Sequence, residues 1–170
     1  MEKLLQLLSS YNFLNNLMPG AVFYHALTFF CGIEITFTNY IDYLFLYYFL
    51  GLVISRVGSV VIKPIMKKFK LIEEAPYEQF VMISKDDKKL DMLSEINNVY
   101  RTFLAGCILL AFVSFYKFLS DIWPTITYAS APAAIILLIL LFGFSFRKQT
   151  KTISERIDAQ QKKRNDIGKP

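Results

Sequence analysis

The chain has 170 residues, a formal net charge of +5 and 54% hydrophobic residues. Its mean hydropathy of +0.37 makes it more apolar than a soluble domain, in which about 45–50% of residues are apolar. This composition excludes a water-soluble globular protein and indicates an integral membrane protein.

Four apolar runs are each long enough to cross the roughly 30 Å hydrocarbon core of a bilayer, which takes about 20 helical residues. They are residues 19–38, 43–62, 102–119 and 126–146. The runs are continuous rather than alternating, which favours helices over a β-barrel. We therefore expect an all-α integral membrane protein with four transmembrane helices, paired as hairpins over residues 19–62 and 102–146.

The distribution of Lys and Arg predicts the orientation of these helices. Residues 56–101 contain nine of the nineteen Lys and Arg, and residues 147–170 contain eight. The connectors near residues 34–42 and 120–124 contain none. Because basic residues are enriched on the cytoplasmic side, we expect a bacterial inner-membrane protein with both termini in the cytoplasm.

Residues 1–18 carry leucines at helical spacing, with Gln, Ser and Asn off that stripe. This pattern predicts an amphipathic helix at the inner interface, and its polar face also suits packing on the bundle or on a second subunit. Pro19 and Gly20 are expected to end this helix before the first span begins. We expect neither a cleavable signal peptide nor a lipid anchor.

The first span contains His25, the only histidine of the chain. It is either a polar side chain satisfied inside the bundle or a proton-sensitive residue on an ion path. A metal site is not expected, because no further ligands stand at a suitable spacing. We expect Cys31 and Cys107 at different depths, as buried and inert thiols rather than a disulfide.

The second span places small residues at Gly51, Ser55 and Gly58, a spacing that lets helix backbones approach closely. We expect this face to take part in self-association.

Arg56 lies within the same run as these small residues. It either extends to the inner headgroups or enters a buried polar cluster with Glu95, Asn97 or Asn98 at the start of the third span. The candidates for buried polar or gating residues are His25, Arg56, Asn98 and Arg101.

Residues 63–101 form a helical cytoplasmic module between spans two and three. Its first part has four lysines expected to contact anionic phospholipid headgroups, namely Lys63, Lys67, Lys68 and Lys70. Pro76 predicts a helix over residues 76–83, and a capping pattern at residues 84–87 predicts one continuous helix over residues 85–119.

Residues 56–101 balance nine basic residues with seven acidic ones, which suits protein contact better than a nucleic-acid surface. An apolar stripe at Leu90, Leu93, Ile96 and Tyr100 either meets a partner or packs within the chain. We expect no direct nucleic-acid site. The candidate partner-binding residues are Tyr77, Glu78, Phe80, Asp86, Asp87 and Asp91.

The fourth span begins after Trp123 and Pro124, and a thin apolar stripe at Ile153 and Ile157 predicts that its helix continues past Phe146. The basic tail, residues 147–170, is expected to be solvated, with lipid, nucleic acid or an acidic partner as alternative contacts. The chain shows no phosphate loop, catalytic triad or zinc spacing, so we expect neither an enzyme nor a cofactor.

Four segments resemble small four-span bacterial membrane proteins of antiphage defence loci, including the membrane component of the Kiwa system. The segments are residues 11–23 (YNFLNNLMPGAVF), 56–59 (RVGS), 75–80 (APYEQF) and 95–102 (EINNVYRT). The resemblance implies an oligomeric inner-membrane sensor that holds a DNA-binding cytosolic partner. We take a homotetramer as the working stoichiometry.

The residues alone leave two other functions open. A pore-forming or depolarising effector is suggested by Arg56, His25 and the small-residue face of the second span. An immunity protein that blocks a pore-forming toxin within the bilayer is the third alternative.

Overall fold

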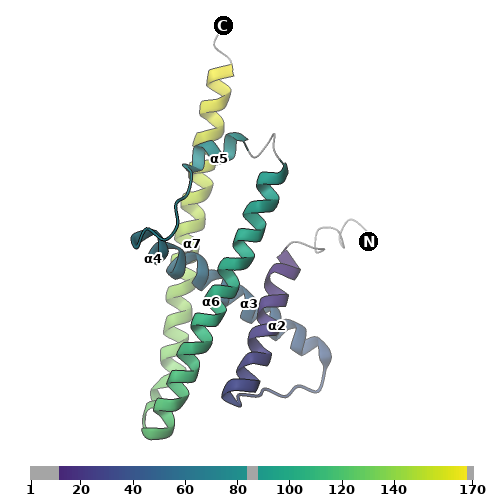
Figure 1. The fold of residues 1–170 in the computed structure, drawn as a ribbon, viewed down its shortest axis with the longest axis vertical. Helices are drawn as coiled ribbons and strands as arrows, with labels where there is room; N and C mark the ends of the chain where they lie inside the picture. Colours follow the sequence, from purple (N-terminus) through teal and green to yellow (C-terminus); the bar gives the residue numbers. More distant parts are fainter. Residues whose placement is uncertain (1–11, 84–87, 168–170) are drawn as a thin grey trace.

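The computed structural model describes residues 12–83 and 88–167, and this part of the chain is helical without strands. Its elements, shown in Figure 1, are α2 (Asn12–Cys31), α3 (Tyr40–Val57), the π-helical segment η1 (Gly58–Ile62), α4 (Lys63–Lys68), α5 (Tyr77–Ile83), α6 (Lys88–Ile122) and α7 (Ile126–Ile167).

Among the described residues, three helical stretches are long and apolar enough to cross a membrane. They are Tyr40–Lys68, Met92–Ile122 and Pro132–Asp158. The prediction of an all-α chain with membrane-spanning helices is confirmed at this level. The helix α2 has 20 residues, or about 30 Å at about 1.5 Å per residue, and does not belong to this set.

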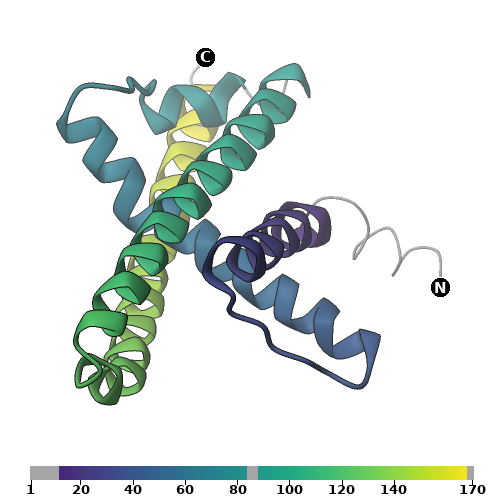
Figure 2. The same cartoon turned by 60° about the horizontal axis from the view of Figure 1, so that its bottom comes forward.

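The segments α3, η1 and α4 follow one another as a single path that crosses α6 and α7 obliquely (Figures 1 and 2). The helix α2 lies along α3 and makes the most extensive contact in the molecule. The connectors 32–39 and 123–125 lie at the lower end of Figure 1, whereas α5, the start of α6 and the end of α7 gather at the upper end. We call this upper end the polar end, because residues 88–95 of α6 and 151–166 of α7 are rich in charged residues.

A small core forms where α2, α3, η1 and α6 meet. Phe23, Ile54, Ile62 and Ala105 pack together there, and Ile54 and Ala105 are essentially inaccessible. Most other large apolar side chains point outward, and only 6% of the apolar window of α7 is buried. Outward apolar side chains suit contact with lipid tails or with another membrane helix.

The backbones of α2 and α3 touch at two glycines. A Cβ atom on Gly51 would lie 1.7 Å from the carbonyl oxygen of Asn16, and one on Gly20 would lie 1.7 Å from that of Tyr47. Gly58 similarly faces α6, where a Cβ atom would lie 3.2 Å from the Arg101 carbonyl oxygen. Helices of the same chain therefore pack on Gly51 and Gly58. The expected role of Gly51, Ser55 and Gly58 in self-association stays a prediction.

The bounds of α2 differ from the predicted ones at both ends. Pro19 stands inside α2, so the expected turn before the first span is wrong; the expected interfacial helix otherwise lies in residues 1–11, outside the described residues. Pro19 and Gly20 are buried, and packing on a neighbouring helix lets a membrane helix tolerate proline. At the other end α2 stops at Cys31 rather than Thr38, because Gly32 adopts a left-handed φ of 62° and bonds back to Thr28, as a C-terminal glycine cap does.

The later helices follow the predictions closely. The helix α5 covers Tyr77–Ile83 against an expected 76–83, and α6 covers Lys88–Ile122 against an expected 85–119. The helix α7 continues past Phe146 to Ile167, as the Ile153 and Ile157 stripe predicts. The helix before α5 ends at Lys68, eight residues before Pro76.

The close approach at Gly51 makes a direct prediction. Gly51→Ala should lower the free energy of unfolding by about 1–3 kcal/mol, because the added methyl group overlaps the α2 backbone. Gly143→Ala is the matched control, since a Cβ atom there meets nothing within 4 Å. Unfolding in mixed detergent micelles measures both variants, and equal stability of the two would contradict the α2–α3 packing described.

Candidate functional site

A tight turn after α4 brings the chain back toward its own lysines. Lys70 has a left-handed φ of 56°, its amide bonds to the Lys67 carbonyl at 3.0 Å, and the Leu71 amide bonds to the Met66 carbonyl at 2.9 Å. This pair of bonds is the Schellman arrangement that ends helices, here with lysine where glycine is usual. The reversal directs residues 71–76 back toward Lys63 and Lys67 of α4.

Glu74, on the returning segment, binds two of the four lysines predicted to contact lipid. Its carboxylate pairs with Lys63 and, at 2.5 Å, with Lys67, whereas Lys68 and Lys70 are exposed. Partial burial raises the pKa of the Glu74 carboxyl, but hydrogen bonds from Lys63 and Lys67 outweigh burial and hold this pKa below its ordinary value. The pairing holds the segment 69–76 against α4.

A second contact joins α7 to the π-helical segment. Lys148 Nζ donates to the Ser59 carbonyl oxygen and, over 2.7 Å, to Ser59 Oγ. The Lys63 amide bonds to the Gly58 carbonyl five residues back, which is the π pattern. The next amide in this pattern would belong to Pro64, which has none, so the Lys148 ammonium supplies the donor that the Ser59 carbonyl lacks.

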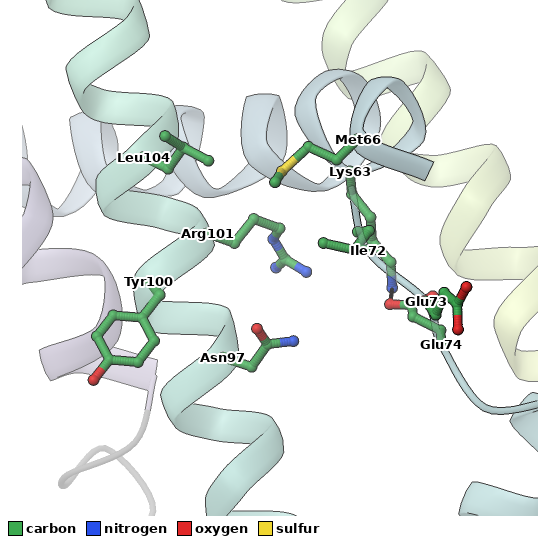
Figure 3. Close-up of a pocket in the computed structure, with 9 residues that line it drawn as sticks. All are labelled: Lys63, Met66, Ile72, Glu73, Glu74, Asn97, Tyr100, Arg101 and Leu104. Carbon is green, nitrogen blue, oxygen red and sulfur yellow. Dashed lines mark ion pairs between the residues drawn. The ribbon is translucent and has the colours of Figure 1, made fainter. Parts of the chain in front are cut away.

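Between α4, the returning segment and α6 lies a cavity of about 390 Å³. Figure 3 shows Arg101 and Asn97 projecting from α6 toward the Lys63–Glu74 pair on the opposite wall. The lining residues are Lys63, Met66, Ile72, Glu73, Glu74, Asn97, Tyr100, Arg101 and Leu104. Its volume is within the roughly 300–1,000 Å³ range of small-molecule sites.

The four candidates for buried polar or gating residues lie in different environments. Arg101 lines the cavity, and Asn98 and Arg56 are half-buried on α6 and α3. His25 is exposed on α2, and its ring lies 5.6 Å from that of Tyr24 and 5.8 Å from that of Tyr47. The expectation that His25 is buried inside the bundle is therefore wrong for the single chain, because the ring packs on the outer side of a tyrosine cluster.

Two of the partner-binding candidates are visible as half-buried side chains, namely Tyr77 and Phe80 on α5. The helix α5 packs on α7, and its Val81 is buried. The other four candidates cannot be placed at the level of side chains: two lie outside the described residues, and two have side chains that the structure does not describe. These are Asp86 and Asp87 in the first group and Glu78 and Asp91 in the second.

The predicted apolar stripe of the module lies mostly on the surface. Leu90 is half-buried, whereas Leu93, Ile96 and Tyr100 are 58%, 41% and 70% exposed. Met92, also exposed at 52%, extends the same surface. We call Met92, Leu93, Ile96 and Tyr100 the α6 stripe; its exposure favours contact outside the chain over packing within it.

The opposite end of the molecule is closed by side chains of α2 and α6. Lys117 Nζ donates to the Cys31 carbonyl oxygen, and Cys31 Sγ lies 3.2 Å from Ser114 Oγ. Tyr24 fixes the connector by donating to the Ile35 carbonyl at 2.8 Å. Cys31 is buried as expected, but Cys107 is exposed, which corrects the expectation that both thiols are buried.

Sequence reasoning missed Glu74, Lys148 and the π segment. Pro64 signals that one carbonyl of the preceding turn lacks a backbone donor, but only the π segment makes this the Ser59 carbonyl. The pairings of Glu74 and Lys148 depend on tertiary contacts and have no local pattern.

No group of three or more His, Cys, Asp or Glu that could hold a metal ion occurs among residues whose side chains the structure describes. The chain matches no family model, no curated protein and no solved structure. The site is therefore interpreted from its own geometry.

The Glu74 pairing predicts a stability that depends on pH. Because the pKa is depressed in the folded protein, the pairing contributes fully above the ordinary glutamate pKa of about 4.3 and is lost as the pH falls through the folded-state pKa. Wild-type protein should unfold at a higher temperature than Glu74→Gln at neutral pH, and the difference should shrink below about pH 4. Glu155→Gln is the control, since the Glu155 carboxylate lies 3.7 Å from Lys151 Nζ, a longer contact than those of Glu74; an equal difference for both variants would contradict the prediction.

The Lys148 contact predicts an interaction between two positions on different helices. Lys148→Met should lower the free energy of unfolding by about 1–3 kcal/mol, as expected for a lost hydrogen bond from a charged group. The same change should cost less in a Pro64→Ala background, because that substitution restores a backbone amide to the helix. A double-mutant cycle measures this difference, with Lys151→Met as the exposed control; equal losses in both backgrounds would refute the role assigned to Pro64.

Proposed function

We propose that this chain is a non-enzymatic scaffold and sensor subunit of a bacterial antiphage defence system, which holds a cytosolic protein at the inner membrane through its polar end. In this proposal both termini and the polar end are cytoplasmic. The excess of Lys and Arg in residues 56–101 and 147–170 supports that orientation.

The observation that carries the proposal is the exposed α6 stripe. The apolar stretch Met92–Ile122 has 31 residues, whereas about 20 suffice to cross a bilayer. Glu95 and Arg101 lie within its first part, so this part projects beyond the hydrocarbon. An apolar stripe that is exposed to water on a charged module is a typical protein-binding surface.

The way the module is joined to the spans supports a sensing role. The helix α6 continues from the stripe into the membrane without a break, and α5 packs on α7. The Glu74 pairing joins the returning segment to α4. A displacement of the spans would therefore reach the stripe through continuous helices rather than through a flexible linker.

The segments that carry the resemblance to antiphage membrane proteins overlap these contacts. Residues 56–59 contain Gly58, which faces α6, and Ser59, which binds Lys148. Residues 95–102 contain Ile96 and Tyr100 of the stripe and Arg101 of the cavity. This overlap supports a defence function, and the outward apolar surface of α7 supports assembly into a homo-oligomer.

The experiment is co-purification of the full chain with products of the genes adjacent to its own, combined with a phage-protection assay. Leu93→Ser together with Ile96→Ser should abolish co-purification and protection while the protein still reaches the membrane. Ile153→Ser is the matched control, because Ile153 on α7 is 53% exposed and lies outside the stripe.

Two results would refute the proposal. Retained co-purification and protection in the double variant would show that the α6 stripe does not hold the partner. Loss of both in Ile153→Ser to the same extent would show that the effect is not specific to the stripe.

A further inference from the structure

The cavity between α4 and α6 combines positive charge with an apolar wall. Arg101 and Lys63 approach it from opposite sides, and Met66, Ile72 and Leu104 supply its apolar side chains (Figure 3). A ligand for this space therefore has an anionic part and an apolar part.

Among the side chains that the structure describes in and beside the cavity, cations outnumber carboxylates. Lys148 interacts electrostatically with Lys63, Lys67 and Arg101, so four cations gather around this part of the molecule. The lining supplies two carboxylates, Glu73 and Glu74, and Glu74 is already shared between Lys63 and Lys67. A bound anion would offset the mutual repulsion of these four cations.

The position of the cavity favours a lipid over a soluble anion. Leu104 lies one turn beyond Arg101 on α6, within residues 102–116, which carry no charge, and Met66 lies on α4 at the end of Tyr40–Lys68. The polar and apolar walls are thus arranged along the direction in which a phospholipid changes from headgroup to acyl chain. Basic pockets between membrane helices at the cytoplasmic face are known to suit anionic headgroups.

We propose that this cavity binds the phosphate group of an anionic phospholipid. Arg101 and Lys63 contact the phosphate oxygens, the Asn97 amide donates to an ester or hydroxyl oxygen, and the acyl chains leave past Met66 and Leu104. This differs from diffuse attraction by surface lysines, because it assigns the lipid to one site on two helices. Binding at this site needs no protein partner and does not rest on the docking function proposed above.

The test uses the purified full chain in nanodiscs of phosphatidylcholine, with or without phosphatidylglycerol. Native mass spectrometry counts the phosphatidylglycerol retained, and thermal unfolding reports its stabilisation. Arg101→Gln should weaken retention at least about tenfold, equivalent to about 1.4 kcal/mol. Asn97→Phe should do the same by filling the cavity from an exposed position of α6, and it keeps the test valid if Arg101→Gln does not fold.

Controls separate this site from other sources of binding. Lys68→Gln together with Lys70→Gln removes two exposed charges outside the cavity and should leave retention unchanged. Equal losses in this control and in Asn97→Phe would overturn the proposal. So would an equal stabilisation by inorganic phosphate or glycerol phosphate in pure phosphatidylcholine, because the ligand would then be a soluble phosphate.

Discussion

The arrangement of the helices depends on one constraint: α2, α6 and α7 must come close to the backbone of the path formed by α3, η1 and α4. The helix α2 reaches this backbone at Gly51, α6 reaches it at Gly58, and Lys148 of α7 reaches it at the Ser59 carbonyl. Membrane helices gain little from hydrophobic burial against one another, so their association relies on close packing and hydrogen bonds. Gly51, Gly58 and Ser59 therefore hold the helices together, as a large apolar core does in a soluble protein.

The helices themselves could be predicted from the sequence, because their signals are local. Apolar runs of about 20 residues indicate spans, Pro76 marks the start of α5, and the spacing from Leu90 to Tyr100 indicates that α6 continues into the membrane. The bounds of α5 and α6 agree with these predictions to within a few residues. The number of spans and the orientation of the termini remain predictions, since α2 is not among the three stretches long and apolar enough to cross.

The candidate site could be predicted only in part. The lysines at the end of α4 and Arg101 of α6 were identified from sequence, but the residues that engage them were not. Glu74 reaches Lys63 because Lys70 adopts a left-handed conformation. A lysine in a sequence does not predict this conformation, which glycine usually adopts. The position of Pro19 was misleading for a related reason, because packing against α3 decides whether a proline ends a membrane helix.

The contact between Lys117 and the Cys31 carbonyl bears on how the chain is assembled during synthesis. The two residues are 86 positions apart, so α2 and α3 leave the ribosome long before Lys117 does. Until α6 has been inserted, the last turn of α2 lacks this ammonium cap, and an unsatisfied carbonyl in an apolar environment is costly. The α2–α3 pair therefore reaches its final form only when α6 has packed against it, which makes the assembly of the two halves sequential rather than independent.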